Sequence, residues 1–208
     1  MKNIYSEIVR VLSSGTPAAL ATIYEVIGSS PRGVGAKYLV RKDRSAFGSL
    51  GGGCLEAKVW QGAIDSINSS KNILMKFDLT DKDMTDSGLI CGGTVAIFVE
   101  PLQSSKGNLF DLYQKVKEMR EQGKRGVLAT VLSRGSTPVS PLASKILLEI
   151  GGEKWGALSE GEAFETEIRR WCESNPLKKL RVHSFSVSDG QYREQVDTCI
   201  TCHKDFRN

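Results

Sequence analysis

The sequence lacks any long apolar run and has only two histidines among its 208 residues. A helix that crosses a membrane needs about 20 consecutive apolar residues, and residues 1–15 carry polar side chains every few positions, unlike the apolar core of a signal peptide. Two histidines leave few candidates for a Ser-His-Asp triad or a zinc hydrolase site. We therefore expect a cytoplasmic protein with no membrane partner, in which histidine-based hydrolysis is disfavoured.

Blocks of positive charge are also missing, although the net charge is +4. The 28 Lys and Arg residues are scattered, and no basic block is interleaved with aromatic residues. This pattern argues against a nucleic-acid partner and suits a small anionic ligand equally well. In a cytoplasmic protein, the five cysteines predict free thiols, metal ligands or redox chemistry, and no disulfide framework.

Glycine, in contrast, is abundant, and three consecutive glycines stand in the segment GSLGGGCLE, residues 48–56. Apolar residues precede it and a helix-forming run follows, so the glycines are expected at a strand-to-helix turn. Such a turn lets the backbone approach a ligand closely, and its N–H groups favour an anion. The same positive potential would stabilise a thiolate on Cys54. The segment predicts a phosphate-binding loop with a reactive cysteine at its edge; a tight turn with Cys54 buried is the structural alternative.

The glycine segment matches neither of the common nucleotide-binding patterns. Gly48 and Gly53 have Walker A spacing, but Cys54 and Leu55 follow them where Lys and Ser or Thr are required. A dinucleotide fingerprint starting at Gly51 would end on Glu56 in place of glycine. Binding of ATP or NAD is therefore disfavoured.

Hydrophobic periodicity predicts an α/β fold built from two similar halves. In the first half it predicts helices over residues 4–14 and 56–67 and strands over 18–24, 37–41, 46–50, 74–79 and 94–100. From about residue 105 the pattern restarts at a nearly constant offset, so that GTPAALATI at Gly15 is answered by GKRGVLATV at Gly123. We predict two tandem pseudo-repeats of helix-strand-strand-strand-helix-strand-strand with mixed sheets, residues 1–104 and 105–208. The alternative is two unrelated segments that share this order.

The two predicted copies differ at the glycine turn. At the constant offset, Gly51-Gly52-Gly53-Cys54 faces Ser159-Glu160-Gly161-Glu162, which has lost the glycine run and the thiol and has gained two acids. An acidic loop repels an anion that a glycine loop would bind. We therefore expect the first copy to carry the site and the second copy to be a degenerate, structural partner.

Two further cysteine motifs have open interpretations. Cys91-Gly92-Gly93 places a second thiol beside flexible backbone, and it could approach Cys54 in space. Cys199-Ile-Thr-Cys202-His203 matches a haem attachment pattern, which requires an exported protein. Because Cys199 falls at the constant offset from Cys91, a remnant of the repeat, a weak metal or thiol site and a frayed tail all remain open.

Three ordered motifs resemble the xanthine dehydrogenase accessory factor (XdhC/CoxI) family. They are GSSPRGVGAK at residues 28–37, FGSLGGGCLE at 47–56 and GLICGGTVAIFVEPL at 88–102, and the resemblance covers about residues 10–102. It implies a chaperone that binds molybdenum cofactor, protects it and helps to deliver its sulfurated form to a molybdenum hydroxylase such as xanthine dehydrogenase. Many members continue into a Rossmann-type domain, whereas no intact glycine fingerprint follows here.

The resemblance implies a set of site residues in the first copy. The cofactor-binding candidates carried over from the family motifs are Arg32, Gly51, Gly52, Gly53, Cys54, Cys91, Gly92 and Gly93. A glycine loop with Arg32 suits the cofactor's phosphate, and the thiols of Cys54 and Cys91 are expected to face molybdenum or a transferable sulfur.

Three functions remain open at this point. The first is a carrier without turnover, and the second is an enzyme in which Cys54 is the catalytic residue, accepting sulfur as a persulfide from a cysteine desulfurase and passing it to the cofactor. The third is a structural component of a molybdenum hydroxylase system with a vestigial site. Repeat units with exposed faces tend to pair, which favours a homodimer.

Overall fold

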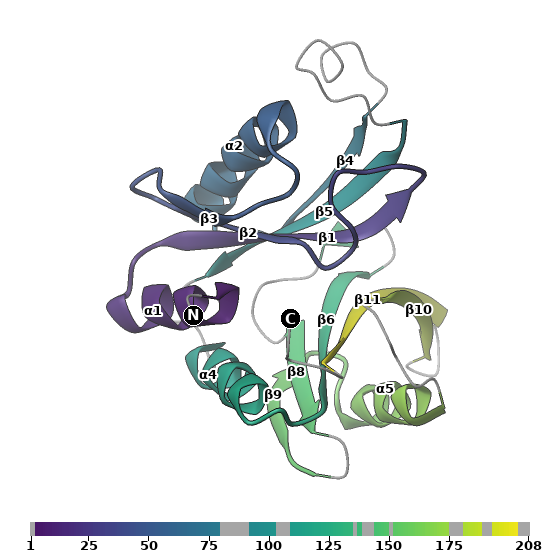
Figure 1. The fold of residues 1–208 in the computed structure, drawn as a ribbon. Helices are drawn as coiled ribbons and strands as arrows, with labels where there is room; N and C mark the ends of the chain where they lie inside the picture. Colours follow the sequence, from purple (N-terminus) through teal and green to yellow (C-terminus); the bar gives the residue numbers. More distant parts are fainter. Residues whose placement is uncertain are drawn as a thin grey trace. The chain divides into compact units, whose positions relative to one another are not determined.

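The computed structural model describes residues 3–79, 92–102, 109–134, 137–138, 144–149, 152–174, 181–188 and 193–203. The chain divides into two compact units, Met1–Ser105 and Lys106–Asn208 (Figure 1). None of the helices in the described part of the chain combines the length and apolar composition that crossing a membrane requires.

The first unit is a five-stranded sheet with a helix at its start and a second helix between its third and fourth strands. Its elements are α1 (Ile4–Ser14), β1 (Ala18–Ile27), β2 (Lys37–Arg41), β3 (Ala46–Gly48), α2 (Gly53–Ser69), β4 (Ile73–Asp78) and β5 (Thr94–Leu102). The strand order is β3-β2-β1-β5-β4. The predicted sequence of helices and strands is confirmed, with α2 beginning earlier and β1 ending later than expected.

Helix α1 forms because its sequence supplies both ends and one apolar face. The side chain of Asn3 accepts the N–H of Ser6 at 3.0 Å, and Gly15 takes the left-handed conformation, with φ 65°, that commonly ends a helix. The buried face consists of Tyr5, Ile8, Val11 and Leu12. Glu7 on this helix pairs with Arg41 of β2 at 2.6 Å, and both side chains are buried.

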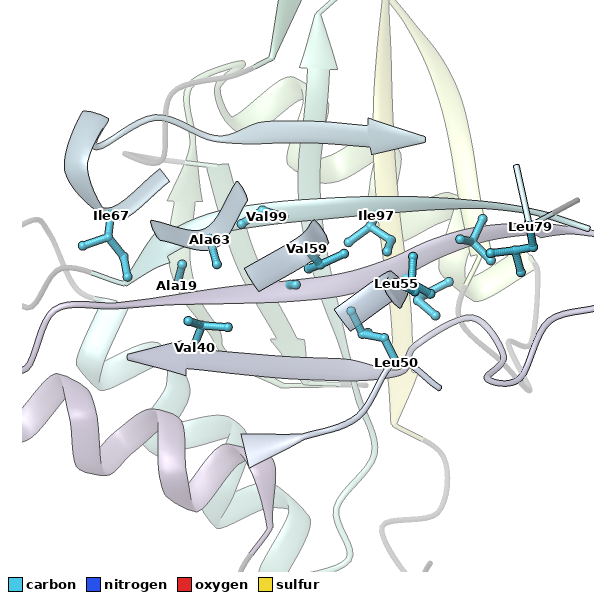
Figure 2. Close-up of a cluster of buried hydrophobic side chains, with 13 residues drawn as sticks. Ala19, Val40, Leu50, Leu55, Val59, Ala63, Ile67, Leu79, Ile97 and Val99 are labelled. Atoms are coloured by element: carbon cyan, nitrogen blue, oxygen red, sulfur yellow. The ribbon is translucent and has the colours of Figure 1, made fainter. Parts of the chain in front are cut away.

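Helix α2 packs on one face of the sheet and covers the core of the first unit. Figure 2 shows Leu55, Val59, Ala63 and Ile67 of α2 directed at Ala19, Val40, Ile97 and Val99 of the strands. Leu50 and Leu55, on either side of the triple glycine, are fully buried in this core. Complete burial of a leucine side chain stabilises a fold by about 1.5–3 kcal/mol. The glycine turn is therefore anchored at both ends.

The prediction of mixed sheets is wrong, because every strand pair described in both sheets is antiparallel. Strands β1, β2 and β3 follow one another as a meander. Helix α2 then carries the chain across the sheet to β4 at the opposite edge, next to β5. The crossover therefore joins the two edges and does not place two parallel strands side by side.

The second unit consists of α4 (Leu109–Glu121), β6 (Gly126–Arg134), β7 (Thr137–Pro138), β8 (Ser144–Glu149), β9 (Lys154–Leu158), α5 (Glu162–Ser174), β10 (Arg181–Ser188) and β11 (Arg193–His203). Its strand order is β10-β11-β6-β8-β9, with the short β7 paired to β6. Read from β9, this is the order of the first sheet. Residues of β6, β8 and β9 pack with α5 in a separate core.

The two sheets also agree in register. Ala18 pairs with Arg41 in the first unit, and Gly126 pairs with Glu149 at the equivalent place in the second. A β-bulge interrupts the pairing between Ile23 and Glu25 in β1, and the matching irregularity in β6 lies opposite Asp197 and Thr198. Such agreement is what a duplicated unit would produce, and duplication itself stays a prediction.

The predicted equivalence of Cys199 with Cys91 is wrong. Cys199 pairs with Thr130 in the second sheet, and in the first sheet Phe98 pairs with Thr22. Cys199 therefore occupies the position of Phe98. The constant offset fails here because residues 79–93 join β4 to β5, whereas only residues 189–192 join β10 to β11.

Candidate functional site

Two of the three sequence motifs meet through their backbones in the first unit. A Cβ atom on Gly28 would lie 3.0 Å from the carbonyl oxygen of Gly92 and 3.1 Å from the Cα of Gly93. A Cβ on Gly93 would collide with the carbonyl oxygens of Ile27 and Ser29. The N–H of Leu79 donates to the carbonyl of Gly93 at 2.8 Å. Only glycine permits this close approach of the loop after β1 to the start of β5.

The remaining motif, residues 47–56, contacts the loop after β1 through Gly51. With φ 121°, Gly51 faces the ring of Pro31, and a Cβ there would lie 2.7 Å from the Pro31 Cβ. The loops 28–35, 48–56 and 92–93 therefore lie together at one end of the sheet. The predicted residues Arg32, Gly51, Gly92 and Gly93 belong to this one cluster of loops, whereas Cys91 lies outside the described residues.

Glu56 organises the turn that residues 48–56 form, which we call the glycine turn. Its Oε1 accepts the hydroxyl of Ser49 at 2.7 Å and the N–H groups of Leu50 and Gly52, both at 2.9 Å. Burial raises the pKa of the Glu56 carboxyl, but these hydrogen bonds outweigh burial and hold the pKa below its usual value. Glu56 is therefore an anion inside its own loop.

These contacts leave fewer backbone N–H groups for a phosphate than the sequence predicted. The N–H of Gly51 donates to the hydroxyl of Ser49 at 3.1 Å and that of Gly52 donates to Glu56, so both donors already have partners inside the turn. The first turn of α2 has no side-chain cap, because its N-cap residue is Gly52. Of the three predicted glycines, only Gly53 contributes its N–H to this uncapped helix start.

Cys54 and Arg32 carry the reactive and cationic groups of the cluster. Cys54 is a free, half-buried thiol at the second residue of α2, and it packs partly against the core. Arg32 is exposed; its carbonyl accepts the hydroxyl of Ser30 at 2.9 Å, and its guanidinium bonds to no residue in the described ranges. A Cβ on Gly52 would meet nothing within 4 Å. Open space, a free cation and a thiol therefore occur in one loop cluster.

The structure gives no support to a metal site formed by protein side chains alone. Within the described ranges, no group of three or more His, Cys, Asp or Glu side chains could hold a metal ion. Cys199 and Cys202 lie in the regularly paired part of β11. Three residues of extended strand separate their Cα atoms by about 10 Å, beyond the 7 Å limit for a disulfide.

The second unit has a related but acidic turn, residues 156–165. The N–H of Leu158 donates to Glu165 Oε1 at 3.1 Å, as that of Leu50 donates to Glu56. Gly161 has φ 84°, the value found at Gly52. The acidic turn is therefore one residue longer, and the equivalent of Cys54 is Ala163, one residue beyond the predicted match at Glu162.

Comparison with known proteins finds a family resemblance in the first unit. Residues 11–78 match the model of the XdhC and CoxI family. The first unit is therefore similar to the XdhC and CoxI family over these residues. The matched residues contain two of the three loops of the cluster, and the loop at Gly92 and Gly93 lies beyond them.

Three curated proteins are similar to this chain. Uncharacterized protein YqeB of Escherichia coli K12 is 32% identical over 47% of the chain and 18% of its own length. A probable xanthine dehydrogenase subunit of Bacillus subtilis 168 is 29% identical, over 60% of the chain and 37% of its own length. The molybdenum cofactor insertion chaperone PaoD of Escherichia coli K12 is 28% identical, over 56% of the chain and 36% of its own length. The chain therefore matches less than two fifths of each relative.

A crystal structure of a xanthine dehydrogenase from Bacillus halodurans has the same fold. The TM-score is 0.66 at 23% sequence identity, and the likeness covers 95% of this chain and 52% of that one. Both units are therefore part of the shared fold.

Glu56 is the residue of the loop cluster that the sequence did not predict as part of the site. Its place in the motif GGGCLE was visible, but only the folded turn shows that its carboxylate accepts three hydrogen bonds. The available signal was the acid that both turns carry a few residues after the last strand residue, Glu56 in one and Glu165 in the other.

Proposed function

We propose that this chain is an accessory protein that binds molybdenum cofactor through its first unit and delivers it to a molybdenum hydroxylase of the xanthine dehydrogenase type. The observation that carries the proposal is the convergence of the three loops 28–35, 48–56 and 92–93 within the first unit. Two similar proteins bear names that fit this role: one is a probable component of xanthine dehydrogenase, and the other is a molybdenum cofactor insertion chaperone.

The residues of the cluster fit the chemistry of the cofactor, a pterin dithiolene with a terminal phosphate. Arg32 offers an exposed guanidinium without a partner in the described part of the chain, and guanidinium binds phosphate through two parallel hydrogen bonds. The Cys54 thiol is a soft ligand of the kind that molybdenum or sulfur chemistry requires. A Cβ on Gly52 would meet nothing within 4 Å, so a ligand could approach the turn at this residue.

Anaerobic binding of the cofactor tests the proposal directly. The purified chain is incubated with molybdenum cofactor, freed of excess by gel filtration, and analysed for molybdenum and for oxidised pterin. We expect retention of both in equal amounts at micromolar protein. Absence of both from the protein fraction would refute the proposed function.

Arg32→Ala supplies the matched test of the site. Loss of a charge-assisted bidentate contact is expected to weaken binding at least tenfold. The control is Lys42→Ala, which removes an exposed cation from the turn after β2, at the opposite end of that strand. Equal retention of the cofactor by both variants would show that binding occurs elsewhere.

Delivery is tested with a cofactor-free hydroxylase. Loaded wild-type chain is expected to restore xanthine oxidation to an apo-enzyme of the xanthine dehydrogenase type faster than free cofactor does. The loaded Arg32→Ala variant, corrected for the cofactor it retains, separates loading from transfer. Equal rates with free and carried cofactor would leave a binding protein without a delivery role.

The free thiol of Cys54 at the start of α2 favours one additional activity, acceptance of sulfur. In that step the S–S bond of a donor persulfide breaks, a new S–S bond forms on the Cys54 Sγ, and the donor leaves as its thiol, with no net oxidation. Incubation with a cysteine desulfurase and cysteine, followed by mass spectrometry, is expected to add one sulfur atom to the peptide containing Cys54. Unchanged sulfuration of the cofactor with Cys54→Ala would exclude this activity.

A further inference from the structure

The N–H groups of Leu50, Gly51 and Gly52 are already used within the glycine turn, and those of Leu50 and Gly52 face the Glu56 carboxylate. Glu56 Oε1 accepts the hydroxyl of Ser49 and the N–H groups of Leu50 and Gly52. A phosphate placed at the same point would meet a carboxylate instead of free N–H groups. Anionic ligands are therefore repelled from the inner side of this turn.

The second oxygen of the same carboxylate has no partner. Within the described ranges, no hydrogen bond or ion pair ends on Glu56 Oε2. The negative charge of Glu56 also acts on a neighbouring side chain. Burial and this charge together raise the pKa of the Tyr38 phenol. Glu56 Oε2 is not one of the enclosed atoms without a partner among the described residues, so it is an acceptor that solvent or a ligand can reach.

In the second unit a lysine neutralises the glutamate at the equivalent position. Glu165 Oε2 accepts a hydrogen bond from Lys154 Nζ at 2.7 Å, while its Oε1 holds the turn. Lys154 is the first residue of β9 and pairs with Leu148, and the equivalent pair in the first unit is Ala46 with Val40. In the first unit Glu56 Oε1 likewise holds the turn, but no lysine or arginine within the described ranges pairs with Glu56 Oε2.

We propose that Glu56 is a ligand-binding residue, and that its Oε2 accepts hydrogen bonds from the edge of the pterin ring that carries the 2-amino group and the N3–H. This inference rests on the proposed function, and it assigns each end of the cofactor to a residue of the cluster. The donor edge of the pterin lies against Glu56, and the terminal phosphate lies toward Arg32. Oε2 alone can accept from both of these adjacent N–H donors, because each carboxylate oxygen offers two lone pairs.

Two small probes distinguish this assignment from phosphate binding at the turn. Pterin carries the 2-amino donor, whereas lumazine has a carbonyl oxygen in its place. Each probe is titrated as a competitor of bound molybdenum cofactor. Wild-type chain is expected to bind pterin at least tenfold more tightly than lumazine, because a site built around a donor rejects the analogue that lacks it. Glu56→Gln is expected to lose most of this preference.

The amide variant keeps the turn intact, so loss of preference is not a loss of fold. A glutamine carbonyl oxygen accepts the same three hydrogen bonds as Glu56 Oε1, and the thermal unfolding midpoint checks that it does. The matched control is Glu165→Gln, which makes the same change in the acidic turn and is expected to leave both probe affinities unchanged. Inorganic pyrophosphate is expected to bind Glu56→Gln and wild type equally, and to bind Arg32→Ala more weakly.

The outcomes separate the two proposals. Equal affinity of wild type for pterin and lumazine overturns the role of Glu56 while leaving cofactor binding in place. Tighter pyrophosphate binding by Glu56→Gln also overturns it, since the phosphate would then lie against the carboxylate. Failure of wild type to retain molybdenum and pterin together refutes the proposed function, whatever the probes do.

Discussion

The glycine turn and the acidic turn are built on the same frame and differ in what they leave unsatisfied. In both turns, the glutamate at the last position accepts the N–H of a buried leucine, Leu50 or Leu158. In the acidic turn, Lys154 neutralises that glutamate, and in the glycine turn no internal cation of the described residues does. The same frame thus carries a paired carboxylate in one unit, and in the other a carboxylate that no lysine or arginine of the described residues pairs with. We proposed above that this difference makes Glu56 available to a ligand.

The largest expected loss of stability concerns the first helix of each unit, α1 or α4. Glu7→Ala leaves the buried guanidinium of Arg41 without its carboxylate, and breaking a buried ion pair costs about 3–5 kcal/mol. The equivalent change in the second unit, Lys115→Ala, removes a contact with the Trp155 ring at 4.6 Å and costs about 0.5–1 kcal/mol.

Tryptophan fluorescence separates the two units in this experiment. Trp60 is the one tryptophan of the first unit, so urea unfolding of a Trp155→Phe, Trp171→Phe background reports on that unit alone. A Trp60→Phe background keeps the Trp155 contact and reports on the second unit. A similar loss of stability from Glu7→Ala in the first background and Lys115→Ala in the second would show that the two helices are held in the same way, contrary to the structure.

A smaller effect is expected where the loops meet. Gly93→Ala puts a Cβ 2.6 Å from the carbonyl oxygen of Ile27 and 2.7 Å from the N of Ser29, and such overpacking costs about 1–3 kcal/mol. The new Cβ would push the loop after β1 away from the start of β5. Because this separates two of the three loops, the variant should also retain less cofactor. Gly92→Ala is the neighbouring control for stability, since its Cβ would meet nothing within 4 Å. Cofactor retention by Gly93→Ala equal to that of the wild type would contradict the convergence of the loops as the basis of binding.

The sequence predicted most of the helices and strands because their signals are local. The apolar spacing and the end residues of α1 required no knowledge of the rest of the chain. The sheets were predicted less well, since pairing is a long-range property, and the crossover through α2 made every neighbour antiparallel. Cys199 was misplaced because a constant offset cannot detect the shorter connection between β10 and β11.

The candidate site was predicted as a list of residues and not as a set of contacts. The glycines were visible as a motif, but their packing against Pro31 and Ser29 depends on how three distant loops fold together. The use of Glu56 as an internal acceptor depends on the closed turn, so a phosphate cradle was the natural expectation from glycine content alone.

Acid and alkali are expected to act on different turns. The pKa of Glu56 in the folded chain lies below its usual value of 4.5, so its contribution to stability is complete above pH 4.5 and is lost as the pH falls through the folded pKa. The pKa of Lys154 is raised above 10.5 by its hydrogen bond to Glu165, so its contribution is complete below pH 10.5 and is lost as the pH rises further.

The pH dependence is measured as the urea midpoint of each unit between about pH 3 and about pH 11, a range that includes the usual pKa values of both groups. Glu56→Gln should flatten the acid side for the first unit, and Lys154→Ala should flatten the alkaline side for the second. The pKa of Asp43 is also lowered, by hydrogen bonds from Ser45, and it adds the same acid dependence to wild type and to Glu56→Gln. An unchanged acid profile in Glu56→Gln would show that the carboxylate is not held as an anion by its turn.

The smallest expected change in stability is also the most direct test of the comparison. Ala46→Lys introduces at the start of β3 the cation that Lys154 supplies at the start of β9. The new lysine is exposed and should stabilise the first unit by only about 0–1 kcal/mol. By occupying Glu56 Oε2 it should nevertheless reduce the preference for pterin over lumazine at least as far as Glu56→Gln does. Ala46→Gln, of similar length and uncharged, is the control. If the lysine variant kept the full preference, Glu56 would not be the acceptor that distinguishes the two turns.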